Sequence, residues 1–318
     1  MLTIQPNTHL NKYVVLKSIN KNNKNPVYKA YIPSNGNEDD NNTKCYIIKA
    51  IPYETEEEKK FYQNETEVLR LFRNISTIAK YKESFIMKND LTGGKQFLFT
   101  VMNFYEHADL YSFYSEHKNE KINSDQIRSI AFQALKILNI VHKKNVIHHD
   151  IKPGNFLIKT LSPLVINITD FEFAVKIKEN ETTKQPLGTC FYMAPELLNG
   201  EPHDTGVDIW ALGVMLYELV AQKLPFNLRY DQSQMFIVRM KVQKNQLAFD
   251  DVFEDELFKD LLSKMLEKDS NNRITAEDAL KHPYFEGYHG IELTKELRRS
   301  YSDFESYGKT NKKKNRQY

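Results

Sequence analysis

The stretch His148-His149-Asp150-Ile151-Lys152-Pro153-Gly154-Asn155 lies near the middle of this 318-residue chain, and Asp170, within Thr169-Asp170-Phe171, follows fifteen residues after Asn155 (170 − 155 = 15). Asp150 carries a carboxylate that can accept a hydroxyl proton. Asn155 and Asp170 carry oxygens of the kind that magnesium prefers in proteins. Side chains of these types, in this order, suit a site that acts on phosphate groups.

These two segments resemble the catalytic loop (residues 148–155) and the magnesium-binding loop of the eukaryotic protein kinases. The resemblance implies an α+β, two-lobed protein-kinase-like fold, with a small β-rich N-lobe, a larger α-helical C-lobe and a ligand cleft between them. The implied parts are an N-terminal extension (1–12), a kinase domain (13–285) made of N-lobe (13–102), hinge (103–108) and C-lobe (109–285), and a C-terminal tail with a basic end (286–318).

The pattern of apolar residues agrees with this order of elements. Strands are expected at 13–16, 27–32, 45–51, 82–87 and 96–102, with a helix at 55–73. Further helices are expected from an N-cap at Ser124, at 207–220, 254–268 and 275–281, and in the tail at 292–307. The sequence therefore predicts a strand-rich part followed by a helix-rich part.

Composition excludes several classes of protein. Lys and Arg number 44 against 42 Asp and Glu, a net charge of +2, which argues against a nucleic-acid binder with a wholly basic surface. Only two cysteines occur, Cys45 and Cys190, so neither a disulfide framework nor a zinc cluster is expected. No run approaches the roughly 18 apolar residues that span a bilayer. The N-terminus lacks the apolar core of a signal peptide, so we expect an intracellular protein, cytoplasmic or nuclear.

Lys49 lies within an apolar strand, where a charged side chain needs a partner. Glu65 lies three and four residues before Val68 and Leu69, which places it on the apolar face of the predicted helix. Glu67 is a competing partner with worse-placed neighbours, and taken alone Lys49 can also be read as a surface lysine on an edge strand. The resemblance pairs Lys49 with Glu65 and directs Lys49 at the α- and β-phosphates of ATP.

The resemblance also assigns roles within the catalytic loop. Asp150 orients the substrate hydroxyl and accepts its proton, and Lys152 neutralises charge on the transferring phosphoryl group. Lysine at position 152 and Thr189, in Gly188-Thr189, resemble the kinases directed at serine and threonine rather than tyrosine.

Further residues are assigned to the nucleotide by the resemblance alone. Met102 guards the back of the adenine pocket, and Asn103, Phe104 and Tyr105 offer backbone hydrogen bonds to the purine. Asp109 meets the ribose or, with equal weight, caps a helix. The remaining pocket residues are Val27, Ile47, which narrows the space above the adenine, and Leu157.

The chain departs from the family at the loop that covers the phosphates. Asn20, Asn22 and Asn25 stand where the family has three glycines. Asn tolerates left-handed backbone better than most residues, but we expect about 1 kcal/mol of strain at each such position and weaker ATP binding. Glu172 replaces the glycine after Asp170-Phe171 and adds charge near the metal, with an effect of either sign.

Residues 170–196, here called the activation segment, end at Glu196, which the resemblance pairs with Arg273 in a buried ion pair. The resemblance also makes Asp208 a buried acceptor of backbone N–H groups from the catalytic loop. His149 stands where the family usually has an arginine that receives a phosphate from the activation segment, so Thr182 and Thr183 need not be phosphorylation switches. Gly154 replaces an acid that some kinases use to bind substrate arginines.

Three functions are compatible with these residues. The first is a protein serine/threonine kinase that uses ATP and Mg²⁺, with Mn²⁺ as an alternative cation, and acts on protein substrates. The second is a pseudokinase, a kinase-shaped binding or scaffolding module, motivated by the missing glycines and Glu172. The third is a kinase-like enzyme for small molecules, which Gly188-Thr189 and Met193-Ala194-Pro195-Glu196 disfavour because they resemble a platform for a protein chain.

Overall fold

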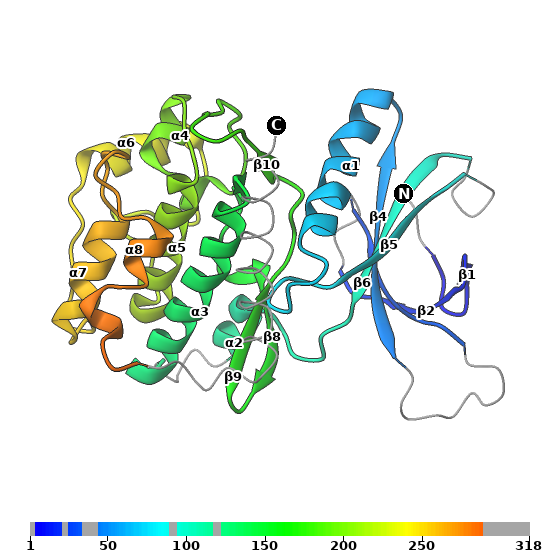
Figure 1. Ribbon diagram of the computed structural model, residues 1–318, viewed down its shortest axis with the longest axis horizontal. Coiled ribbons are helices and arrows are strands. Elements are labelled where there is room, and N and C mark those ends of the chain that lie inside the picture. The colour runs from blue at the N-terminus through cyan, green and yellow to red at the C-terminus, as the bar shows by residue number, and fades with distance from the viewer. Residues whose placement is uncertain (1–3, 21–24, 34–43, 89–93, 117–121, 289–318) are drawn as a thin grey trace, which may run out of the picture. The chain divides into compact units, whose positions relative to one another are not determined.

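The computed structural model describes residues 4–20, 25–33, 44–88, 94–116 and 122–288, which fall into two compact units coloured in sequence order in Figure 1. The first unit ends at Glu106 and the second begins at His107, a boundary inside the predicted hinge. The first unit is strand-rich and the second is helix-rich, which confirms the predicted α+β class. Asn22 and the predicted tail helix with its basic end lie outside the described residues.

The N-terminal unit is built on one six-stranded antiparallel sheet with the order β1-β2-β3-β4-β6-β5. Its strands are β1 (His9–Leu10), β2 (Tyr13–Ser18), β3 (Val27–Tyr31), β4 (Cys45–Tyr53), β5 (Tyr81–Met87) and β6 (Gln96–Asn103). β1 pairs with β2, and Ile4 is buried in the core of the sheet. Part of the predicted N-terminal extension (1–12) therefore belongs to the sheet. The strand β1 has only two residues, too few for a recognisable strand pattern in the sequence.

Alternation along the central strands places the core of this unit on one face of the sheet. Tyr28 in β3, Ile48 and Ala50 in β4, and Phe99 and Val101 in β6 are each at most 1% exposed. One helix, α1 (Glu56–Leu71), belongs to this unit, and it begins with a capping box in which Thr55 and Glu58 satisfy each other's backbone N–H groups. The predicted strands and helix are present within a few residues.

The C-terminal unit consists mainly of helices. These are α2 (Leu110–Glu116), α3 (Ser124–His142), α4 (Pro195–Asn199), α5 (Gly206–Ala221), α6 (Met235–Lys244), α7 (Glu256–Met265) and α8 (Ala276–Ala279), with short 3-10 turns η2 (Pro153–Asn155), η3 (Cys190–Tyr192) and η4 (Pro283–Phe285). The apolar helix α5 packs against α3 and α7 (Figure 1). Within the described ranges, no helix combines the length and apolar character needed to cross a bilayer.

Two small antiparallel strand pairs in this unit were missed by the sequence analysis. β7 (Val146–Ile147) pairs with β10 (Val175–Lys176), and β8 (Phe156–Leu161) pairs with β9 (Leu164–Ile168). β9 is buried along its whole length and so lacks the alternation that marks a half-exposed strand. The Ser162-Pro163 turn was the available signal for the β8–β9 hairpin.

The start of α3 differs by one residue from the prediction. Asn123, rather than Ser124, is the N-cap: its side-chain oxygen accepts a hydrogen bond from the Gln126 N–H at 2.8 Å. The Gln126 side chain in turn accepts one from the Asn123 N–H at 3.1 Å, which completes a capping box. Asn123 is preferred because only position 123 has Gln three residues later.

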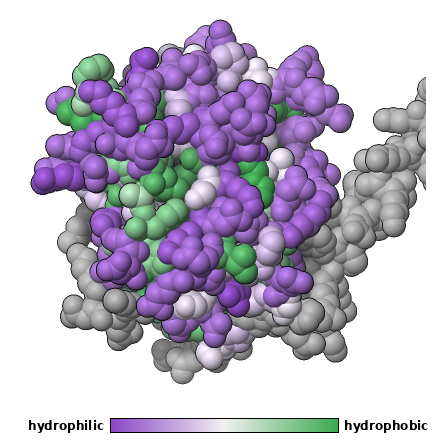
Figure 2. Space-filling model, turned by 90° about the vertical axis from the view of Figure 1, so that its left-hand side faces the viewer, coloured by the Kyte–Doolittle hydropathy of each residue, from purple (hydrophilic) through white to green (hydrophobic). Residues whose placement is uncertain are grey.

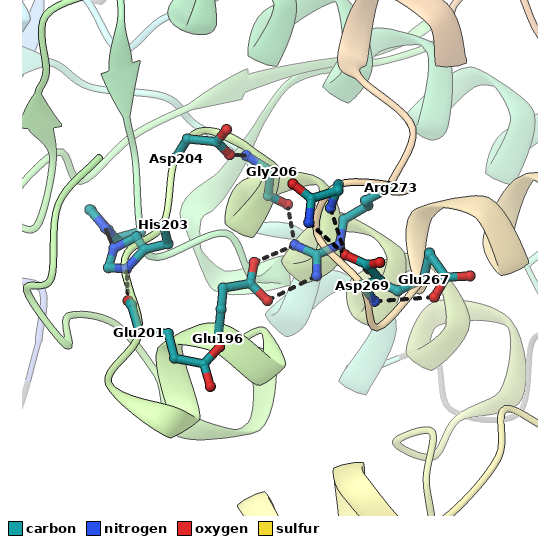
Figure 3. A network of polar contacts seen from close by, with 10 residues as sticks. Glu196, Glu201, His203, Asp204, Gly206, Glu267, Asp269 and Arg273 are labelled. Atoms are coloured by element: carbon teal, nitrogen blue, oxygen red, sulfur yellow. Dashed lines mark hydrogen bonds and ion pairs between the residues drawn. The ribbon is translucent and has the colours of Figure 1, made fainter. Parts of the chain in front are cut away.

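A buried ion pair between Glu196 and Arg273 ties α4 to the loop before α8 (Figure 3). Arg273 Nη1 and Nη2 donate to the two carboxylate oxygens at 2.6 and 2.9 Å. Arg273 also donates to the carbonyls of Gly206 and Glu267, and its guanidinium lies 5.2 Å from the Trp210 ring. The predicted pair is confirmed, and it is bidentate, with two further hydrogen bonds from Arg273 to backbone carbonyls.

Helix α6 lies on a mostly hydrophilic face of the C-terminal unit that also shows apolar residues (Figure 2). Val238 and Val242 are its buried residues. Met235, Phe236 and Met240 are exposed, and Phe236 is 73% exposed. α6 therefore attaches to the unit through a narrow apolar face, and its exposed side carries these apolar residues among Arg239, Gln243 and Lys244.

Replacing Arg273 by alanine is expected to lower the free energy of unfolding by about 3–5 kcal/mol, because Glu196 stays buried without its partner. The matched control is Arg229→Ala: Arg229 also contacts the two oxygens of one carboxylate, that of Asp231, but both side chains are more than half exposed. The control is expected to cost at most about 1 kcal/mol. Urea unfolding measures both, and equal losses would contradict the burial argument.

Candidate active site

The catalytic loop is fixed through Asp208, in the first turn of α5. Its carboxylate is 0% exposed, and it accepts hydrogen bonds from the backbone N–H groups of His148 and His149 and from His142 Nε2, each at 2.9 Å. Burial raises the pKa of Asp208, but the His142 bond and the charges of the nearby histidines outweigh burial and hold that pKa below its ordinary value. The predicted backbone-accepting role is confirmed.

Asp150 directly follows His149 in the chain, and three side chains hold its carboxylate. Lys152 Nζ lies 2.7 Å from Asp150 Oδ2, and Thr189 Oγ1 donates to Oδ1 at 2.7 Å. Asn155 Nδ2 donates to Oδ2 at 2.8 Å and to the Asp150 carbonyl at 2.7 Å. Lys152 Nζ also donates to Thr189 Oγ1 at 2.9 Å. The carboxylate is therefore fixed in orientation, and the structure brings Asp150, Lys152 and Asn155 together with Thr189.

The hairpin β8–β9 brings the two predicted metal ligands close in the fold. Asn155 immediately precedes β8, and its carbonyl accepts a hydrogen bond from the N–H of Thr169, the residue before Asp170. Both side-chain N–H groups of Asn155 point to Asp150. The side-chain oxygen, Oδ1, is therefore the atom of Asn155 that is left to face a cation. Asp170 is partly exposed and has a left-handed backbone, with φ +62°. One carboxylate and one amide oxygen fit a magnesium ion that completes its shell with phosphate oxygens and water.

Phe171 and His148 lock the segment beside Asp170. Phe171 is 0% exposed and its ring lies 4.6 Å from the His148 ring, centroid to centroid. His148 Nε2 donates to the Thr169 carbonyl at 3.1 Å. Glu172 is not among the described residues with positive φ, so this backbone does not require the glycine that the family has there.

Lys49 and Glu65 form the charged pair of the N-terminal unit. Lys49 Nζ lies 3.4 Å from Glu65 Oε2, and Lys49 and Glu65 are 8% and 1% exposed. Lys49 lies opposite Val27 of β3 and Thr100 of β6, so it is in the middle of the sheet and not on an edge. Glu67 is exposed, which rules out the competing partner in this structure.

The predicted adenine-contacting residues lie at the end of β6. Met102 is 7% exposed and opposite Ile47 in the register of β4 and β6. The N–H of Asn103 donates to the Lys80 carbonyl at 3.0 Å, and that of Phe104 donates to the Cys45 carbonyl at 3.3 Å. A purine contact at either N–H therefore requires the corresponding backbone hydrogen bond to break. The roles of Asn103, Phe104 and Tyr105 stay predictions.

Asp109 acts as the cap of α2. Its two carboxylate oxygens accept hydrogen bonds from the N–H and the hydroxyl of Ser112, both at 2.9 Å. Asp109 also forms a bridge to Leu157, which is half-buried on β8. The cap interpretation is observed, whereas the ribose interpretation of Asp109 stays a prediction.

The structure corrects the expectation of backbone strain at two asparagines of the predicted phosphate loop. Asn20 and Asn25 are not among the described residues with positive φ, so the expected strain is absent at these two positions. Asn20 instead closes the loop with its side chain: Nδ2 donates to the Asn25 carbonyl at 3.1 Å, and Oδ1 accepts from the Val27 N–H at 2.9 Å. The sequence predicts asparagine here as a strained replacement for glycine. At position 20, the side-chain amide of Asn20 instead forms two hydrogen bonds that glycine could not form.

Two contacts made by His149 of the catalytic loop were not found from sequence. At Gly188, φ is +110°, and a Cβ atom there would lie 2.1 Å from the His149 carbonyl oxygen. His203, after α4, contacts the His149 ring, with 2.9 Å between the Nε2 atoms. Gly188-Thr189 was noted for its threonine alone, and nothing in the sequence around His203 marks it as a partner of residue 149.

Residues 35–285 match the family model described as "Protein kinase domain". The chain belongs to the protein kinase family. Among its relatives is the "Phosphorylase b kinase gamma catalytic chain, liver/testis isoform" of Homo sapiens, 30% identical over 252 residues, which are 75% of this chain and 57% of that protein.

Two other relatives have related names. "Calcium-dependent protein kinase 4" of Plasmodium berghei is 30% identical over 75% of this chain and 44% of its own length. "Serine/threonine-protein kinase 17A" of Oryctolagus cuniculus is 33% identical over 52% of this chain and 42% of its own length. The chain thus spans about half the length of the curated relatives it matches, and all three of these relatives are named as kinases.

Replacing Gly188 by alanine is expected to displace the activation segment from the catalytic loop, since the new methyl group meets a backbone oxygen that cannot rotate away. Phosphate transfer should fall at least tenfold, the equivalent of about 1.4 kcal/mol. Gly200→Ala is the control: it also has positive φ, +71°, but open space around the added Cβ. It should cost about 1 kcal/mol of stability with transfer retained. Equal loss of transfer in the two variants would contradict this role of Gly188.

Proposed function

We propose that this chain is a protein serine/threonine kinase that transfers the γ-phosphoryl group of ATP to serine or threonine hydroxyls of protein substrates. The observation that carries the proposal is the Asp150 carboxylate held by Lys152, Thr189 and Asn155. Such an arrangement presents a fixed proton acceptor beside a fixed cation, the combination that phosphoryl transfer to an alcohol requires. The name of one relative, serine/threonine-protein kinase 17A, points to the same reaction.

Three residues of the catalytic loop and two of the activation segment have tasks in this proposal. Asp150 orients the acceptor hydroxyl and takes its proton, and Lys152, at 2.7 Å from Asp150, stabilises the negative charge of the transferring group. Asn155 and Asp170 hold Mg²⁺, or Mn²⁺ in its place. When bound, that ion neutralises the phosphate oxygens. Thr189 links the activation segment to Asp150, so the position of the segment acts on the base directly.

Lys49 and Glu65 serve the nucleotide in the N-terminal unit. A lysine that is 8% exposed keeps its charge only beside a partner, and Glu65 at 3.4 Å provides one. We assign Lys49 to the α- and β-phosphates and Glu65 to its orientation. Val27, Ile47, Met102 and Leu157 remain proposed pocket residues.

The proposed location is intracellular, cytoplasmic or nuclear. Cys45 and Cys190 form no disulfide, which is the normal state of thiols in a reducing compartment. Protein substrates and ATP are the proposed partners. A preference for basic substrates lacks support, because Gly154 stands where an acid would bind arginine.

The alternative of a pseudokinase rested on the asparagines of the phosphate loop and on Glu172. Asn20 and Asn25 have no left-handed strain, and Glu172 has no positive φ. The base Asp150 and the proposed ligand Asn155 are also fixed in place. Among the described residues, these observations favour catalysis over a scaffolding role.

Asp150→Asn is expected to lower phosphate incorporation into a generic protein substrate by about 10²- to 10⁴-fold, because the amide cannot accept the hydroxyl proton. Asp251→Asn is the control, since Asp251 is an exposed carboxylate of the same unit and should leave the rate unchanged. The assay uses the full chain with ATP and Mg²⁺, and Asp170→Ala serves as a second inactive variant. Incorporation that survives Asp150→Asn would refute the proposed function.

Asn20→Gly restores the residue of the family but should weaken nucleotide binding, because it removes both bonds that close the loop. A loss of about 1 kcal/mol, roughly fivefold in the Kd of Mg-ATP, is expected. In Asn25→Gly the accepting carbonyl is retained, so the change should be smaller. A thermal-shift titration measures both variants. Tighter binding by Asn20→Gly would show instead that the asparagine obstructs the phosphates.

A further inference from the structure

The rings of His149 and His203 meet inside the C-terminal unit. These two residues, here called the histidine pair, are 5% and 3% exposed. Their Nε2 atoms lie 2.9 Å apart, with the rings nearly perpendicular at 89°. A nitrogen–nitrogen distance of 2.9 Å is a hydrogen-bond distance, so one hydrogen must lie between the two atoms.

The second nitrogen of each ring faces a backbone carbonyl. His149 Nδ1 lies 3.1 Å from the Phe173 oxygen. His203 Nδ1 lies 3.2 Å from the Glu201 oxygen, a contact drawn in Figure 3. Because a carbonyl oxygen only accepts, each Nδ1 must carry a hydrogen.

The contacts of the pair therefore need more hydrogens than two neutral rings possess. Two contacts to carbonyls and one between the rings require three hydrogens. Each neutral imidazole carries one N–H, which gives two. With two hydrogens, one contact always has two acceptors facing each other, whereas one added proton satisfies all three contacts.

We propose that His149 and His203 share a single added proton, and that this proton holds the activation segment against the catalytic loop. The pair then acts as a pH-dependent regulatory element of this chain, strongest when it carries one proton. Gain of a second proton, or loss of the first, breaks the ring-to-ring contact.

The pair connects three segments that are far apart in sequence. His149 belongs to the catalytic loop and adjoins Asp150, and Phe173 lies at the start of the activation segment. The backbone N–H and carbonyl of His203 exchange hydrogen bonds with those of Thr183, both at 2.9 Å. A change at the ring of His203 is therefore transmitted to the middle of the activation segment.

Burial and the neighbouring histidines oppose a second proton on the pair, whereas Asp208 favours protonation. Burial lowers the pKa of His149 to about 4; Asp208 opposes this effect, and the charges of His203 and His148 add to it. Asp208 accepts the His149 N–H at 2.9 Å and also the His142 ring, so part of its charge is already compensated. Glu201 and Asp204, on either side of His203 in sequence, are exposed.

The sign of the pH dependence follows from these groups. The pair titrates as a unit, so its protons are counted for the two rings together. Below about pH 4 a second proton places two N–H groups face to face. When the pH rises far enough for the shared proton to leave, two acceptors face each other. The activation segment should therefore be held best above about pH 4, while the pair carries one proton, and be released as the pH rises and that proton leaves.

The test uses the full chain with ¹⁵N-labelled histidine. Nitrogen chemical shifts report the tautomer and charge of each ring between pH 4.5 and 9, and exposed His107 serves as a reference within the same sample. We expect His149 and His203 to keep Nδ1 protonated throughout and to take up one proton together. Two independent titrations, or a bare Nδ1 on either ring, would overturn the proposal without any variant.

Hydrogen exchange at Thr183 and His203 then tests the consequence. After correction for the intrinsic pH dependence of exchange, protection of these two amides should fall roughly tenfold across the titration, the worth of one charge-assisted hydrogen bond. In His203→Gln the carboxamide donates to His149 Nε2 without an added proton, so protection should not vary with pH. In His203→Leu protection should be low at every pH. An unchanged pH dependence in His203→Gln would refute the proposed role of the proton.

Discussion

The buried carboxylate of Asp208 is the interaction on which the rest of the C-terminal unit depends. A charge with no exposure to water is tolerated only when its oxygens are satisfied, and here two backbone N–H groups and one imidazole satisfy them. The two backbone donors belong to His148 and His149, which immediately precede Asp150. The requirement to satisfy a buried charge on α5 thereby fixes the position of the proposed base.

Further contacts tie the activation segment to the same point. Thr189 donates to Asp150, Gly188 packs on the His149 carbonyl, and the histidine pair joins His149 to the loop after α4. Arg273 holds the end of the segment through Glu196. These contacts have different chemistry, and among those named here the histidine pair is the one that we propose to depend on an added proton.

The sequence predicted what depends on local pattern or on a family motif. Runs of β-rich residues predicted the strands of the first unit. Spacing placed Glu65 on the apolar face of its helix, and the family resemblance paired it with Lys49. The motif assigned tasks to Asp150, Lys152 and Asn155, which the structure brings together. The features that were not predicted depend on contacts that no local sequence pattern records. His203 meets His149 across 54 residues of chain, and β9 is buried on both faces and so lacks alternation. Asn20 was judged by backbone preference, whereas its side-chain bonds decide its role.

The most direct test of this account is the rate of phosphate transfer by Asp208→Asn. The amide group directs N–H atoms at one of the two backbone donors, so the catalytic loop must shift and take Asp150 with it. The account predicts a fall in kcat of at least about 100-fold, equivalent to about 2.7 kcal/mol, in a protein whose circular dichroism shows a retained fold. A kcat within about twofold of the unmodified chain would contradict the claim that Asp208 positions the base.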